Sequence, residues 1–208
     1  MDNTFRTIKE PLSGEISEKK SRFIASIVPV KSEEEALAHI EKIKKLHRDA
    51  RHNCWAYILS EGNISRSSDD GEPSGSAGKP MTDVIAGKGL KDVCAVVTRY
   101  FGGTLLGVGG LVRAYSGAVE EALKDAEFTL MTDCERMTVT CGYTDLGKVK
   151  NLIEKTRSKT LAADYAENVV FDIAVVRDDA QKLTSDIKES TADRAAVLSQ
   201  GVFFCIIS

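Results

Sequence analysis

The chain has 208 residues, of which 42% are apolar and 28% are charged, and its net charge is −3. That length allows one domain or two modest ones with a core each, and the composition is ordinary for a soluble globular protein. The balanced charge lacks the basic excess of a broad nucleic-acid binder, and no apolar run approaches the roughly 20 residues of a membrane span. We also expect no signal peptide, because residues 1–4 do not resemble the start of one.

The first half of the sequence predicts strands and helices around two glycine-rich stretches. Residues 21–30 form an apolar run typical of a strand. Ser32 and Glu35 form a capping box, which predicts a helix with an apolar stripe to about residue 49. Further strands are predicted at 53–59 and 92–101, and helices at 80–85 and 109–126. The polar segment 62–79 is too long for a simple connection, which indicates a functional loop.

The last third predicts the order β-α-β-β-α-β. Its elements are expected at 137–143, 145–156, 159–166, 169–176, 178–189 and 202–207. This order is the signature of the ferredoxin-like split βαβ unit. A boundary within 129–134 gives a first domain of residues 1–131 and a second of 132–208. The predicted fold class is α+β with two domains.

Groups that could bind an anion are concentrated in segments 69–80 and 98–115. The first supplies hydroxyls, backbone amides and Lys79, and the second places glycines directly before a helix, where amides attract anions. Arg99 and Arg113 could then each bind a phosphate or carboxylate through two nitrogens of the guanidinium group. The alternative is that the glycines allow close packing and that each arginine pairs with a carboxylate. Neither segment has the spacing of a nucleotide-binding P-loop or a dinucleotide fingerprint.

Acid–base chemistry is the other candidate activity. Asp69, Asp70 and Glu72 could hold a cation or act as acid and base, or they could belong to turns in a solvated loop. His52 could act as a general base with Cys54 or Ser76 as the nucleophile, or it could be structural.

The cysteines and histidines do not form a metal-binding pattern. The five cysteines stand singly, and the three histidines lie in or just after one helix without a cysteine or carboxylate at ligand spacing. We therefore expect buried, reduced, structural cysteines, with no metal and no cofactor. We also expect a cytoplasmic protein without a membrane partner.

Four segments of the first domain resemble the IMPACT family, and most closely its bacterial two-domain members of the YigZ type. They are residues 18–24, 51–57, 69–80 and 98–115. The resemblance implies an N-terminal α/β sandwich of the ribosomal-protein and GHMP-kinase type. It also implies a C-terminal ferredoxin-like domain similar to the small domains of elongation factor G.

The resemblance implies a role linked to translation. Eukaryotic members relieve repression of translation by binding the activator of a starvation-responsive kinase. This role depends on an additional N-terminal RWD domain, which we do not expect in this chain because the segments that resemble the family begin near residue 18. We therefore expect the role not to carry over. What remains is a non-catalytic regulatory protein that binds RNA, the ribosome or a translation-associated protein through its glycine-rich cleft. The alternative is an enzyme that acts on a small phosphorylated or peptide-like substrate through Asp70 or Glu72 with His52. The expected anion- or partner-binding residues are Arg51, His52, Asp70, Glu72, Ser76, Lys79, Arg99 and Arg113.

Overall fold

The computed structural model describes residues 4–207. The chain forms two compact units, Phe5–Thr129 and a second that comprises chiefly the chain from Leu130 onward. The two-domain α+β class predicted from the sequence is confirmed. The predicted boundary lay between residues 131 and 132, and the units divide between Thr129 and Leu130. Among the described helices, none is long and apolar enough to cross a membrane.

The first unit is built on a five-stranded antiparallel sheet in the order β2-β3-β6-β4-β5. Its strands are β2 (Leu12–Glu18), β3 (Ser21–Pro29), β4 (His52–Ile58), β5 (Ser65–Ser68) and β6 (Val93–Tyr100). The short β1 (Thr4–Ile8) runs beside residues 89–91, where the Arg6 amide donates to the Gly89 carbonyl at 3.1 Å. Strand β6 is central and almost wholly buried, as its continuous apolar run predicted. Strands β1, β2 and β5 were not predicted.

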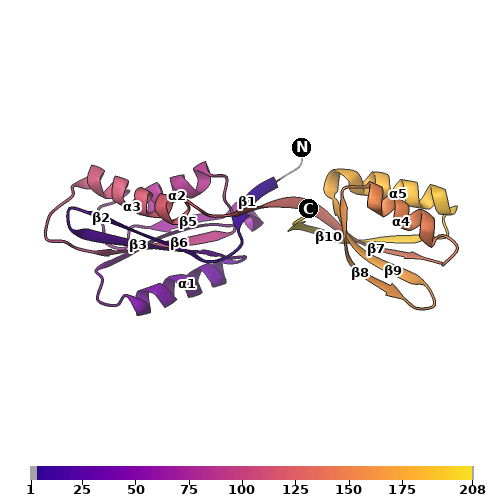
Figure 1. Cartoon of the computed structure of the whole chain (residues 1–208), viewed down its shortest axis with the longest axis horizontal. Coiled ribbons are helices and arrows are strands. Elements are labelled where there is room, and N and C mark those ends of the chain that lie inside the picture. The colour runs from indigo at the N-terminus through magenta and orange to yellow at the C-terminus, as the bar shows by residue number, and fades with distance from the viewer. Residues whose placement is uncertain (1–3, 208) are drawn as a thin grey trace. The chain divides into compact units, whose positions relative to one another are not determined.

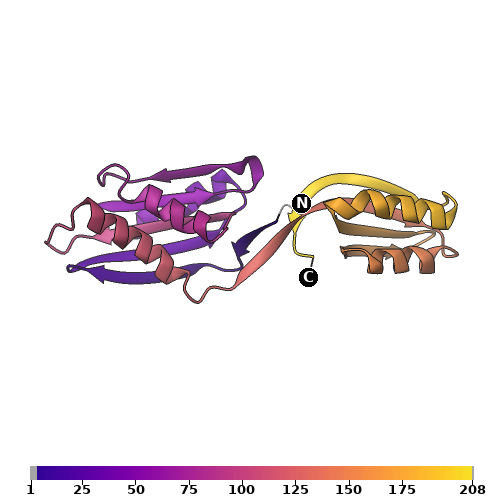
Figure 2. The ribbon, with the colours of Figure 1, turned by 90° about the horizontal axis from the view of Figure 1, so that it is seen from above.

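Helices cover both faces of this sheet. Helix α1 (Glu33–Leu46) lies on one face, and α2 (Gly78–Gly87) and α3 (Val108–Ala122) lie side by side on the other (Figures 1 and 2). The predicted cap of α1 is confirmed, because the Ser32 hydroxyl accepts from the Glu35 amide at 3.2 Å. The Glu35 carboxylate accepts from the Lys31 amide at 2.7 Å, one residue before the position that a capping box predicts. A short 3-10 turn, η1 (Glu61–Asn63), precedes β5.

The second unit has the predicted β-α-β-β-α-β order. Its elements are β7 (Phe128–Cys141), α4 (Leu146–Lys155), β8 (Ser158–Tyr165), β9 (Val169–Val176), α5 (Arg177–Thr191) and β10 (Ala196–Cys205). Its antiparallel strands lie in the ferredoxin-like order β10-β7-β9-β8. Helices α4 and α5 cover one face (Figure 1).

The stretch 129–134, within which the domain boundary was predicted, is part of a strand. Strand β7 begins at Phe128, and β10 pairs with it from Thr132 onward. Ladder hydrogen bonds to β10 thus hold residues 132–134 extended, although the apolar pattern of the stretch is weak.

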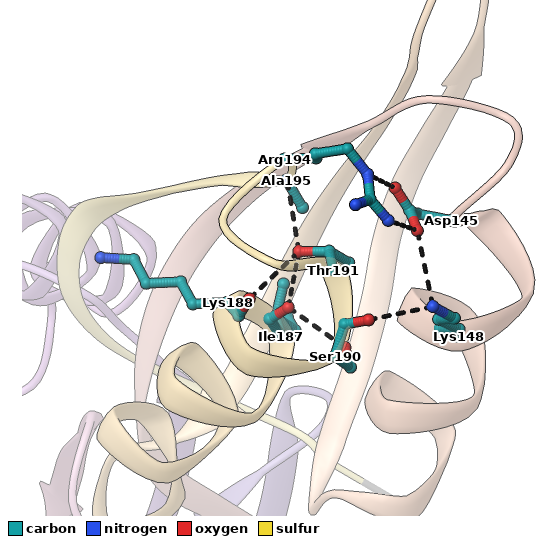
Figure 3. Close-up of polar contacts among 8 residues, drawn as sticks. All are labelled: Asp145, Lys148, Ile187, Lys188, Ser190, Thr191, Arg194 and Ala195. Carbon is teal, nitrogen blue, oxygen red and sulfur yellow. Dashed lines mark hydrogen bonds and ion pairs between the residues drawn. The ribbon is translucent and has the colours of Figure 1, made fainter.

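A polar network joins the start of α4 to the connection between α5 and β10 (Figure 3). Arg194 donates twice to Asp145, from Nε at 2.9 Å and from Nη2 at 2.7 Å. Lys148 Nζ donates to the Ser190 carbonyl at 3.0 Å. The buried Thr191 hydroxyl donates to the Ile187 carbonyl at 2.7 Å. These bonds satisfy polar groups at two chain reversals and fix them against each other.

Candidate functional site

A cavity of about 470 Å³ lies in the first unit where β4 begins and β6 ends. His52 and Arg99 are cross-strand partners at this edge. The loop after β5 forms another part of the wall, and the segment between β6 and α3 forms the rest. The lining residues are Arg51, His52, Glu72, Pro73, Arg99, Phe101, Leu105, Leu106, Gly107, Val108 and Leu111. The structure therefore brings together four of the eight predicted residues, Arg51, His52, Glu72 and Arg99.

Glu72 and Arg99 form an ion pair in the cavity wall. Arg99 Nη1 donates to Glu72 Oε1 at 2.7 Å, and the side chains are 8% and 4% exposed for Arg99 and Glu72, respectively. The Tyr115 hydroxyl donates to the same oxygen at 2.9 Å, and burial raises the pKa of Tyr115, so this hydroxyl stays protonated. The guanidinium also lies 5.5 Å from the ring centroids of Phe23 and Phe101. Arg99 is therefore paired with the Glu72 carboxylate. The sequence analysis gave this pairing as the alternative to binding of an external anion.

In segment 69–80, three of the amides expected to bind an external anion are occupied by Asp69. Its Oδ1 accepts from the amides of Ala77 at 2.9 Å and Gly78 at 2.8 Å, and its Oδ2 accepts from Gly75 at 2.8 Å. Burial acts to raise the pKa of Asp69, but these three hydrogen bonds outweigh it and hold the pKa below its ordinary value. The glycine-rich loop is thus folded around a carboxylate of its own chain.

Asp70 contacts both α1 and β4, and its carbonyl group orients the ring of His52. Asp70 Oδ1 accepts from Lys44 Nζ at 3.0 Å, and Oδ2 accepts from the Asn53 amide at 2.8 Å. His52 Nδ1 lies 2.9 Å from the Asp70 carbonyl oxygen. Because a carbonyl oxygen only accepts, the ring donates from Nδ1, and the neutral ring keeps its lone pair on Nε2.

The other predicted residues are not in the cavity wall. Ser76 is fully buried, and its hydroxyl has no hydrogen-bond partner within residues 4–207. Lys79 pairs with Asp83 one turn further along α2. Arg113 lies on the exposed side of α3. Asp70 points its carboxylate at Lys44 and Asn53 instead of the cavity.

Neither proposed nucleophile is available to His52. The Cys54 thiol is buried and donates to the Asp69 carbonyl at 2.9 Å, and burial raises its pKa to about 12, so it does not supply a thiolate. Ser76 is outside the cavity wall. Within residues 4–207, no three His, Cys, Asp or Glu side chains gather as metal ligands do.

Sequence reasoning missed the apolar part of this site. Phe101, Leu105 and Val108 line the cavity and are 52%, 83% and 55% exposed. The available signal was Leu105 in a segment with neither helical nor strand periodicity; its neighbour Leu106 packs against the core, whereas Leu105 is exposed. We call Phe101, Leu105 and Val108 the apolar rim of the cavity.

Each unit contains a segment that matches a protein-family model. Residues 19–123 match the model of the Impact N-terminal domain, and residues 139–194 match "Domain of unknown function (DUF1949)". The chain is 40% identical over 198 residues to "IMPACT family member YvyE" of Bacillus subtilis, a match that covers 95% of this chain and 91% of that protein.

Other relatives match at similar identity. "IMPACT family member YigZ" of Escherichia coli is 39% identical over 160 residues, 76% of this chain and 78% of that protein. "Protein IMPACT homolog" of Dictyostelium discoideum is 39% identical over 98 residues, 44% of this chain and 28% of that protein. A solved structure described as "Crystal structure of an hypothetical protein" is 32% identical and superposes with a TM-score of 0.66, covering 97% of this chain and 98% of that one.

Proposed function

Because this chain belongs to the IMPACT family, we propose that it is a non-catalytic regulatory protein of the translation apparatus. Its first unit takes an apolar segment of a translation-associated protein into the cavity beside His52 and Arg99. The link to translation comes from the family resemblance. The choice of a protein partner comes from the composition of the cavity wall.

The apolar rim is the observation that carries the proposal. Leu105 is 83% exposed beside a cavity of about 470 Å³. Contiguous exposed apolar side chains around a concavity are typical of sites that bind another protein. Arg51 adds an exposed cation at the same wall, which favours a segment that also carries an acidic side chain.

The polar groups of the site favour binding over catalysis. Both carboxylates of the enzymatic alternative have structural partners, Glu72 in Arg99 and Tyr115 and Asp70 in Lys44 and Asn53. RNA is the second candidate, because the half-exposed ring of Phe101 could stack on a base beside Arg51.

Photo-crosslinking distinguishes these candidates. A benzophenone amino acid is placed at Leu105 and, as a matched control, at Leu46, which is 69% exposed on the opposite face of the sheet. Each variant is irradiated in a translation system reconstituted from purified bacterial ribosomes and factors. We expect the Leu105 probe to crosslink to a ribosomal protein or factor, in a product that survives ribonuclease, and the Leu46 probe not to do so.

A binding measurement completes the test. Leu105→Asp should weaken binding to the crosslinked protein at least about tenfold, because a buried leucine contributes roughly 1.5–3 kcal/mol. Leu46→Asp should leave it unchanged. Equal crosslinking from both positions contradicts the proposal. Ribonuclease-sensitive crosslinks together with binding that falls steeply with salt would assign the site to RNA instead.

A further inference from the structure

Two of the five cysteines meet in the second unit. Cys134 lies in β7 and Cys205 lies near the end of β10, and their Sγ atoms are 3.3 Å apart. Cys134 is opposite Phe203 in the ladder, so Cys205, two residues further along, projects on the same side of the sheet. Both are free thiols. No pattern in the sequence predicts this pair, because 70 residues separate the two positions along the chain.

We propose that Cys134 and Cys205 form a thiol–disulfide exchange site that reacts with small-molecule disulfides of the glutathione type. This inference rests on the second unit alone and is independent of the cavity in the first. A disulfide has an S–S length of about 2.05 Å, so bond formation requires the two sulfur atoms to approach by only about 1 Å.

The end of β10 is placed to make that approach. The strand is interrupted by a bulge between Ser199 and Gly201, and Gly201 has a φ of +108°. Beyond the bulge, residues 201–205 are held by their ladder to β7. A bulge of this kind bends the strand and increases its local twist. Cys205 is the last residue of β10, so the small approach of its Sγ atom falls at the end of the strand and not within it.

The two thiols have different environments, which sets the order of the reaction. Cys134 is fully buried, whereas Cys205 is partly exposed. Burial raises the pKa of Cys134 to about 12, so its thiolate is scarce before the pair reacts.

The Cys205 thiolate attacks one sulfur of glutathione disulfide, whose S–S bond breaks and releases one glutathione thiolate. Cys134 then loses its proton as its sulfur attacks Cys205 Sγ, and the second glutathione thiolate leaves. The protein dithiol is oxidised by two electrons, and one glutathione disulfide is reduced to two thiols.

The test is a reaction of the intact, folded chain with glutathione disulfide, followed by alkylation and peptide mapping. We expect a peptide pair joined through Cys134 and Cys205, while Cys54, Cys94 and Cys141 are alkylated only after unfolding. We also expect the melting temperature of the second unit to rise by about 10 °C, because the bond closes a long loop.

Variants test the order of attack. Cys134→Ser should stop at a glutathione adduct on Cys205, because no second thiol is near to displace it. Cys205→Ser should leave Cys134 unmodified. Cys141→Ser, in the same strand, should react as the unaltered chain does. Far-ultraviolet circular dichroism checks that each variant folds, and Cys134→Ala replaces Cys134→Ser if the buried hydroxyl prevents folding.

Three outcomes overturn the proposal. The first is an unaltered chain that stays reduced in excess glutathione disulfide. The second is an unaltered chain that stops at the mixed disulfide on Cys205. The third is crosslinking scattered among other cysteine pairs, which would indicate reaction of unfolded chains.

Discussion

Glu72 occupies the centre of a small buried cluster in which every charge has a partner. Its carboxylate receives the Arg99 guanidinium at 2.7 Å and the Tyr115 hydroxyl at 2.9 Å. Desolvating two charges is unfavourable, and their attraction offsets this only while both are present. The pair therefore fixes the loop of Glu72 to the end of β6 more than it contributes net stability, and the cavity wall depends on it.

Removing one residue of the Glu72–Arg99 ion pair should destabilise the fold far more than replacing both. We expect Glu72→Leu to lower the free energy of unfolding by about 3–5 kcal/mol, because Arg99 stays buried without its counter-charge. The double variant Glu72→Leu with Arg99→Met should lose much less than the sum of the single changes. Urea unfolding of the four members of this cycle measures the coupling. Glu15→Ala, which removes an exposed partner of Arg22, is the control and should barely move the midpoint.

The sequence could predict that Arg51, His52, Glu72 and Arg99 lie near one another, because they belong to motifs that resemble one family. It could not predict which charges neutralise each other. Asp69, Asp70 and Glu72 are close in sequence, yet they have unrelated partners: loop amides, Lys44 and Asn53, and Arg99 with Tyr115. Those partners come from β4, α1, β6 and α3, whose packing no local pattern encodes.

At the scale of elements, the network around Asp145 joins the beginning of α4 to the end of α5 (Figure 3). Asp145 accepts both hydrogen bonds of the Arg194 fork and lies 3.8 Å from Lys148 Nζ. The hydrogen bonds from Arg194 hold the pKa of Asp145 below its ordinary value of 3.8. A carboxyl group with a lowered folded-state pKa stabilises the fold above the unfolded pKa and loses that contribution as the pH falls through the folded value.

Acid should therefore weaken the second unit through this contact. We expect Asp145→Asn to lower its melting temperature at neutral pH and to flatten the decline of that temperature between neutral pH and about pH 3. Calorimetric scans across that range measure both effects. The exposed Asp164, replaced by Asn, should leave the profile unchanged. An equal decline in the unaltered chain and Asp145→Asn would contradict this account.

The elements that sequence reasoning found are those with a strong apolar period or run. The stripe of α3 and the run of β6 belong to this group. Strand β5 reads Ser-Arg-Ser-Ser and is mostly exposed, so pairing with β4 alone makes it a strand. In β2, only the fold explains why position 14 requires glycine: the Cβ of any other residue would lie 2.5 Å from the Ala122 amide nitrogen of α3.

At the scale of the whole molecule, each unit has its own core. Buried side chains of the first unit cluster on both faces of its sheet, whereas those of the second cluster between its sheet and α4 and α5. A single unfolding transition is therefore a poor assumption, because two units with separate hydrophobic cores can unfold independently.

The single tryptophan allows the two transitions to be separated. Trp55 lies in β4, so its fluorescence reports on the first unit, whereas circular dichroism reports on both. Ile173→Ala, in the core of the second unit, should cost about 2–5 kcal/mol and shift part of the dichroism curve while the fluorescence midpoint stays. Ile27→Ala, in the first unit, should shift the fluorescence midpoint. Coincident shifts in both signals for both variants would show one cooperative molecule.

The carboxylate of Asp69 has a consequence for engineering. Three amides converge on it at 2.8–2.9 Å, as they would on a guest ion. Substituting glycine for Asp69 removes the carboxylate and leaves the three amides that bind it without that partner. We expect the order of that loop to depend then on dissolved acetate or phosphate that binds the freed amides.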